Sequence, residues 1–102
     1  YASAATVYQS VLNQNATNQE ALLGLATALK GKGDHQGAVS VLNRLIGVNP
    51  NFAPAYYNLG EAYESMGNMD QAKQAFSLFK QKSQGNLGDN PAVYLKMKKL
   101  GL

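Results

Sequence analysis

Apolar residues recur along most of the chain at intervals of three and four residues, the spacing that places side chains on one face of an α-helix. Short breaks that contain Gly, Pro or Asn separate the periodic segments. The pattern predicts helices over about residues 1–15, 18–31, 35–48, 52–66 and 69–82, with a sixth that follows Asp89 or Asn90. The expected fold is therefore all-α, with about six helices.

The predicted boundaries coincide with residues that favour helix starts and stops. Thr17 with Glu20 three residues later forms the pattern of a capping box, in which two side chains satisfy free amides of the first turn. Asn68 with Gln71 repeats that pattern, and Asp34 is a favoured N-cap. The remaining signals are the first-turn prolines Pro54 and Pro91 and the helix ends at Gly31, Gly33, Asn49-Pro50-Asn51 and Gly67.

The same apolar pattern occurs twice, at an offset of 34 residues. The second copy reads Tyr56-x2-Leu59-Gly60-x2-Tyr63, then Ala72-x3-Phe76 and Phe79, and the first reads Leu22, Leu25, Ala26 and Leu29, then Ala38-x3-Leu42, Leu45 and Pro50. These residues resemble the tetratricopeptide repeat, a helix–turn–helix unit of this length. The resemblance covers nearly all of the chain, and it implies a right-handed superhelical stack of helix pairs.

The resemblance divides a single domain, residues 1–102, into four parts. Residues 18–51 and 52–85 are complete repeats, and residues 1–17 are the second half of a truncated repeat. Gln84 stands where the family has a closing proline, and the loop at residues 83–90 is longer than a usual repeat junction, so the regular array ends there. Residues 86–102 are expected to be this loop and a C-terminal capping helix, with Val93, Met97 and Leu100 buried and with Lys96 and Lys99 in water.

Composition narrows the class of partner. The net charge is +3, but the lysines fall near predicted helix C-termini, where they complement the helix dipole, so we expect no nucleic-acid partner. The chain has no run of about 18 apolar residues that could span a membrane, and no cysteine. The low content of charged residues, with many Asn, Gln and Ser, favours a bacterial envelope or secretion-associated scaffold, with the cytoplasm as the alternative compartment. The start at Tyr1 rather than Met indicates part of a longer protein.

No set of residues carries the chemistry of a catalytic or metal site. His35 is the only histidine, and it is interpreted as a solvated turn residue because no second ligand stands at metal-binding spacing. Glu61 and Glu64 share one predicted helix, whereas the paired acids of glycosidases come from opposite sides of a cleft. We interpret the two as charges that line a groove, or as solvated surface. We expect no enzyme activity, no cofactor and no metal.

In the family that this chain resembles, the first helix of each repeat lines a concave groove. The groove residues that this implies are Glu20, Leu23, Thr27, Lys30, Tyr57, Asn58, Glu61 and Glu64. Leu23 and Tyr57 are expected to contribute most, because they are adjacent, apolar or amphipathic, and lie off the packing stripe. The alternative is that Tyr57 packs on the neighbouring helix.

The resemblance implies a non-catalytic scaffold that binds a peptide or a partner helix in this groove. The alternative is a self-associating module that pairs through residues 1–15, whose apolar side lacks a partner helix. The best-known groove of the family clamps the C-terminal carboxylate of a chaperone with Lys, Asn and Arg side chains. Asn58 matches the middle asparagine, but Leu23 and Thr27 stand where Lys and Asn are required, so we do not expect chaperone-tail binding.

Overall fold

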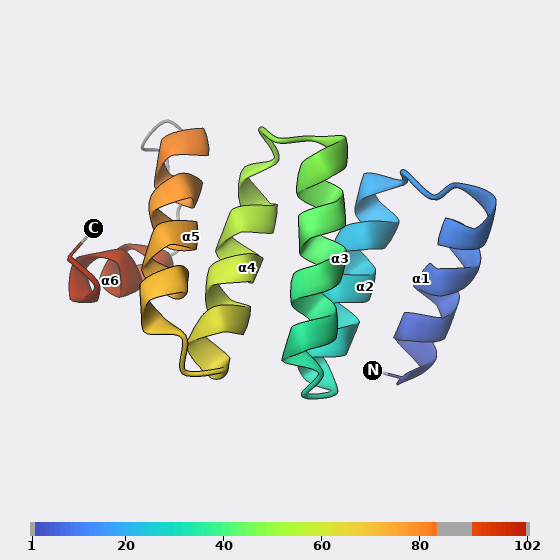
Figure 1. Cartoon of the computed structure of the whole chain (residues 1–102), viewed down its shortest axis with the longest axis horizontal. Helices are drawn as coiled ribbons and strands as arrows, with labels where there is room; N and C mark the ends of the chain where they lie inside the picture. The colour runs from blue at the N-terminus through green and yellow to red at the C-terminus, as the bar shows by residue number, and fades with distance from the viewer. Residues whose placement is uncertain (1, 84–90, 102) are drawn as a thin grey trace.

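The computed structural model describes residues 2–83 and 91–101, and this part of the chain contains six α-helices and no strand. Figure 1 shows α1 to α5 side by side in an upright row, with α6 lying across the end of the row next to α5. The helices are α1 (Ala2–Gln14), α2 (Gln19–Gly31), α3 (His35–Val48), α4 (Ala53–Ser65), α5 (Met69–Lys82) and α6 (Pro91–Lys99). The predicted all-α architecture is confirmed, with each described helix boundary within two residues of the expected one.

The start of α2 differs from the predicted capping box. The N-cap is Asn18, whose side chain accepts a hydrogen bond from the amide of Ala21 at 2.9 Å. Thr17 instead donates its own amide and its hydroxyl to Oδ1 of Asn15, at 3.2 and 3.1 Å, in the turn before the helix. Asparagine is preferred over threonine at the N-cap, so residue preference agrees with the observed choice.

An Asn18→Ala variant is expected to lose about 1 kcal/mol of unfolding free energy, the usual cost of removing an N-cap side chain. Thr17→Ala, one residue away, should cost less than about 0.5 kcal/mol, because its bonds are exposed and lie outside the helix. Urea unfolding followed by circular dichroism measures both changes. A larger loss for Thr17→Ala would mean that Thr17, and not Asn18, caps the helix.

The two turns inside the repeats are equivalent. Gly33 and Gly67 follow the first helix of each pair with φ of +89° and +80°, a left-handed conformation that glycine adopts without steric cost. Asp34 then caps α3 as predicted, accepting a hydrogen bond from the amide of Gly37 at 3.0 Å. Asn68 occupies the same position before α5, but its side chain makes no capping bond, so the predicted box with Gln71 is not formed.

The paired helices approach closely where one of them carries a small residue. A β-carbon built on Gly60 of α4 would lie 2.8 Å from the ring of Phe76 in α5, a side chain with no exposed surface. In the same way, a β-carbon on Gly24 of α2 would lie 2.3 Å from the ring of Tyr8 in α1. Glycine at these two positions therefore sets the spacing of both helix pairs.

The core is divided into two clusters. The larger one joins α1 to α5 and contains the fully buried Leu22, Leu42 and Leu45. The smaller one joins α5 to α6 through Ala72, Phe76, Val93 and Met97. Val93 and Met97 are buried as predicted, whereas Leu100 is only partly buried. None of the described helices is long and apolar enough to cross a membrane.

Candidate functional site

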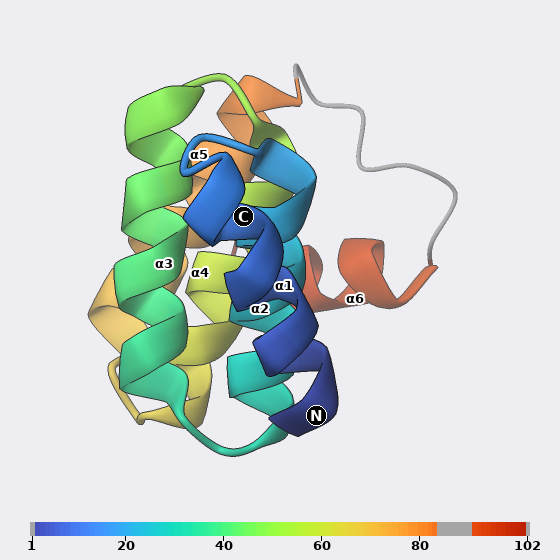
Figure 2. The same cartoon turned by 90° about the vertical axis from the view of Figure 1, so that its right-hand side faces the viewer.

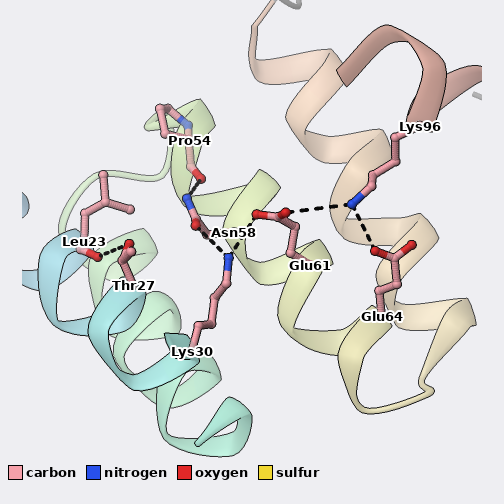
Figure 3. Close-up of polar contacts among 8 residues, drawn as sticks. All are labelled: Leu23, Thr27, Lys30, Pro54, Asn58, Glu61, Glu64 and Lys96. Carbon is pink, nitrogen blue, oxygen red and sulfur yellow. Dashed lines mark hydrogen bonds and ion pairs between the residues drawn. The ribbon is translucent and has the colours of Figure 1, made fainter. Parts of the chain in front are cut away.

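Four of the eight predicted groove residues form one polar network on the face shared by α2 and α4. Lys30, in the last turn of α2, donates from Nζ to Oδ1 of Asn58 at 3.1 Å and to Oε1 of Glu61 at 2.9 Å (Figure 3). Asn58 in turn donates from Nδ2 to the carbonyl of Pro54, one turn earlier in α4, at 2.9 Å. The amine, the amide and the carboxylate therefore hold one another in fixed positions.

Lys96 of α6 extends this network, although the sequence predicted that it would face water. Its Nζ donates to Oε1 of Glu64 at 3.0 Å and lies 3.8 Å from Oε2 of Glu61 (Figure 3). The prediction was wrong because the helical pattern shows only which residues of α6 share a face and not which side chains of other helices lie near them. Figure 2 shows α6 on the side of the row away from α3. The contacts of Lys96 with Glu61 and Glu64 join this helix to α4. The sequence did contain a signal for this contact, because Glu61 and Glu64 lie one turn apart on α4 and can bind a cation together.

Burial and charge determine the protonation of this network. Burial lowers the pKa of Lys96, but its hydrogen bond to Glu64 and the nearby carboxylate charges outweigh it and raise the pKa above its usual range. Burial also raises the pKa of Tyr57, and Glu61 adds to that effect. At neutral pH the amine is charged and the phenol neutral. Because the folded state binds the lysine proton more tightly, this pairing stabilises the fold at neutral pH and is lost as the pH rises above the ordinary lysine range.

Tyr57 packs on the neighbouring helix. Its ring centroid lies 5.4 Å from that of Phe76, edge to face, and 5.2 Å from that of Phe79, both in α5. The amine of Lys96 lies 5.7 Å from the Tyr57 ring centroid, within cation–π range. Leu23, its expected neighbour in the groove, packs instead against the larger core cluster. The structure thus places the two residues in different clusters, and their part in binding stays a prediction.

The other three predicted residues line a hollow of about 470 Å³ between α1 and α2. Thr27 is exposed there, and its hydroxyl donates to the carbonyl of Leu23 at 3.0 Å. The walls of the hollow are mostly apolar, with Glu20 and Thr27 as its polar members; the lining residues are Ala4, Tyr8, Glu20, Leu23, Gly24, Thr27 and Ala28. The predicted groove residues therefore fall into three parts, which we name the polar network, the Tyr57 cluster and the hollow.

The described residues contain no group of three or more histidine, cysteine, aspartate or glutamate side chains able to hold a metal ion. His35 was predicted to be a solvated turn residue, but it is half-buried in the first turn of α3, and its Nδ1 is buried without a hydrogen bond.

Comparison with known proteins supports the repeat assignment. A family model described as tetratricopeptide repeat matches residues 1–51 and 29–85. A solved structure of the first TPR of Spaghetti (RPAP3), bound to the HSP90 peptide SRMEEVD, matches with a TM-score of 0.82 and 16% identity, over 95% of this chain and 74% of that chain; at this identity the likeness concerns the fold alone. No curated protein matches the sequence.

Two structures of MamA are 28% identical to this chain, with TM-scores of 0.78 and 0.77. Each match covers 96% of this chain, which spans 57% and 54% of the two MamA chains.

Proposed function

Because the chain belongs to the tetratricopeptide repeat family, whose members are generally non-enzymatic scaffolds, we propose that it binds a short peptide or a partner helix without catalysing a reaction. The binding surface is the face of α2 and α4 that carries the polar network, with Leu23 and Thr27 at its α2 end. The partner lies across this face and is recognised by hydrogen bonds to Asn58 and apolar contact with Leu23.

The observation that carries this proposal is the polar network itself. Side chains from α2, α4 and α6 are held in place before any partner arrives, by bonds of 2.9 to 3.1 Å between Lys30, Asn58, Glu61, Lys96 and Glu64. A preformed surface loses little side-chain entropy on binding, which is the main cost of ordering an interface. Polar groups fixed in this way favour specific recognition over non-specific adhesion.

The charges of the network also limit the class of partner. Its two lysines are paired with its two glutamates, so the face carries no excess of positive charge. Asn58, which matches the asparagine of the chaperone-tail clamp, is bonded to Lys30. An acidic C-terminal tail would find no free cation among these residues. We therefore propose a partner whose contacts are uncharged or of mixed charge.

The test is binding of peptides selected against the protein from a random display library. Asn58→Ala is expected to weaken the binding of the selected peptides about tenfold, or about 1.4 kcal/mol, because it removes an amide at the centre of the face. Fluorescence anisotropy with labelled peptide gives the two dissociation constants. Circular dichroism of the variant checks that the fold is retained.

Asn43→Ala is the matched control, since Asn43 is an exposed asparagine in the middle of α3. It should leave the affinity within about twofold of the parent value. If peptides bind equally well to the parent and to both variants, the α2–α4 face is not the binding surface. If no peptide is selected at all, the proposed function fails.

A further inference from the structure

α6 is seated on the row of helices and is not a further member of it. Figure 1 shows α1 to α5 upright, whereas α6 runs across the end of the row. The extensive helix-to-helix packing that builds the row joins α1 to α5. Among the described residues, α6 is attached through side chains that include Phe76 of α5 and Met97 of α6. It is therefore placed as a segment bound to the row would be.

The residues of α6 that contact the row share one face of the helix. Val93 and Met97 are buried in the cluster that contains Phe76, and Leu100 packs at its edge. Lys96 lies between them in the sequence, and its amine is 5.4 Å from the centroid of the Phe76 ring. The four residues of α6 follow the spacing i, i+3, i+4 and i+7. An amphipathic helix that binds a groove uses anchors at this spacing.

The surface under α6 has an aromatic floor and an acidic edge. Tyr57 and Phe79 pack on the buried cluster and form part of the floor. Glu64 belongs to the edge, and its ion-pair partner among the described residues is Lys96. Without α6, this carboxylate would lose its cation and the rings would be open to water. The surface therefore fits a helix that supplies one cation between apolar side chains.

We propose that α6 is a displaceable occupant of this surface and that the partner is a helix of the same pattern. That pattern is one lysine or arginine with apolar residues three positions before it and one and four positions after it. The inference rests on the proposed binding function and names the partner class for the α4 end of that face. α6 has nine residues, a length at which a helix is marginally stable by itself. It occupies the surface until the partner replaces it, so α6 is autoinhibitory.

The first experiment measures binding of a fluorescent peptide with the sequence of residues 91–101 to the whole chain, by anisotropy from roughly 1 μM to 1 mM. Met97→Glu in the protein should bind this peptide at least about tenfold more tightly than the parent. The variant places a carboxylate in the apolar cluster, so its own α6 no longer competes for the surface. Leu95→Glu is the matched control on α6, because Leu95 is 67% exposed, and it should bind within about twofold of the parent.

Lys96→Glu in the protein is a second opening variant. It removes the ion pair with Glu64 and leaves the buried apolar residues of α6 unchanged, so it keeps the test valid if Met97→Glu folds poorly. Circular dichroism checks the fold of each variant. Lys96→Glu should also tighten binding of the peptide, by at least about threefold, since the tethered helix then competes less well.

A charge swap tests the recognition of the cation. In the Met97→Glu protein, adding Glu64→Lys should weaken binding of the peptide at least about fivefold, because two amines then face each other. A peptide that carries Lys96→Glu should show the opposite preference, binding the Glu64→Lys protein more tightly than the protein that keeps Glu64.

Displacement is measured on a protein whose α6 keeps its contacts with the row. The chain has no cysteine, so Leu95→Cys accepts a single fluorophore on the exposed side of α6. The anisotropy of this label should fall as unlabelled peptide is added, because a detached helix moves more freely than a bound one.

Equal affinity of the parent and both opening variants overturns the proposal, as does the absence of peptide binding to all three. A peptide that binds without changing the label on α6, or whose affinity ignores the charge of residue 64, also contradicts it. Tighter binding to the opening variants, the reversed preference in the charge swap and the fall in anisotropy together support it. None of these readouts uses library peptides or Asn58→Ala, so the inference can fail while the proposed binding function stands.

Discussion

Gly60→Leu is expected to lower the unfolding free energy by at least about 3 kcal/mol, the upper end of the usual cost of overpacking. Even a β-carbon at this position would lie 2.8 to 2.9 Å from three atoms of the Phe76 ring. That ring has no exposed surface and cannot move into solvent. The α4–α5 pair must therefore separate. For a domain of this size the loss corresponds to a fall of roughly 12 °C or more in the thermal midpoint.

Gly47→Leu is the matched control, because Gly47 lies in α3 and a β-carbon there would meet no atom within 4 Å. Replacing a helical glycine on an open surface should leave stability unchanged or raise it by up to about 1 kcal/mol. Scanning calorimetry on the two variants separates close packing from the general effect of adding a side chain. Equal midpoints for Gly60→Leu and the parent protein would mean that α4 and α5 do not pair as described.

Phe76→Ala is expected to cost about 3–5 kcal/mol, the range for removing a buried aromatic ring. Phe76 contacts Tyr57 of α4, and it belongs to the cluster that holds Val93 and Met97 of α6. The loss should therefore extend beyond global stability to the attachment of α6. Urea unfolding measures the first effect, and amide hydrogen exchange in residues 91–99 measures the second.

Leu78→Ala, two residues away and 40% exposed, is the control and should cost less than about 1 kcal/mol. If Phe76→Ala leaves exchange in α6 as slow as in the parent, the helix is held mainly by the Lys96 ion pairs and not by the aromatic cluster.

The fold could be predicted because its determinants are local. Leu22 and Leu42 are spaced with their apolar neighbours at the helical period, and both are fully buried. Gly33 and Gly67 adopt the left-handed conformation that the breaks in the pattern indicated. Each of these features depends on residues within one or two turns, so no knowledge of the distant chain is needed to find it.

The parts of the site that depend on longer-range geometry could not be predicted in the same way. The sequence identifies α6 as amphipathic, but its contact with α4 joins residues about 32 positions apart, so Lys96 was assigned to water. Tyr57 lies off the packing stripe of its own helix, so the sequence left two interpretations open, and its contact with Phe79 of α5 is the one that the structure contains. The hollow was foreseen only as an apolar side of residues 1–15, because its walls come from two helices.

Three side-chain bonds in the described part of the chain join residues that lie about one repeat apart. Arg44 donates to the carbonyl of Ala16 at 3.0 Å, Asn49 to Gln19 at 3.1 Å and Lys82 to Asn51 at 3.4 Å, each across 28 to 31 residues. Among the described helices, α1 and α5, which lie at the two ends of the row, do not pack against each other. The cooperativity of unfolding therefore arises mainly from the interfaces between neighbouring helix pairs, as in a one-dimensional model with nearest-neighbour coupling. A perturbation at one end weakens with each interface it crosses, so the α1 end can open while the α4–α5 end remains folded.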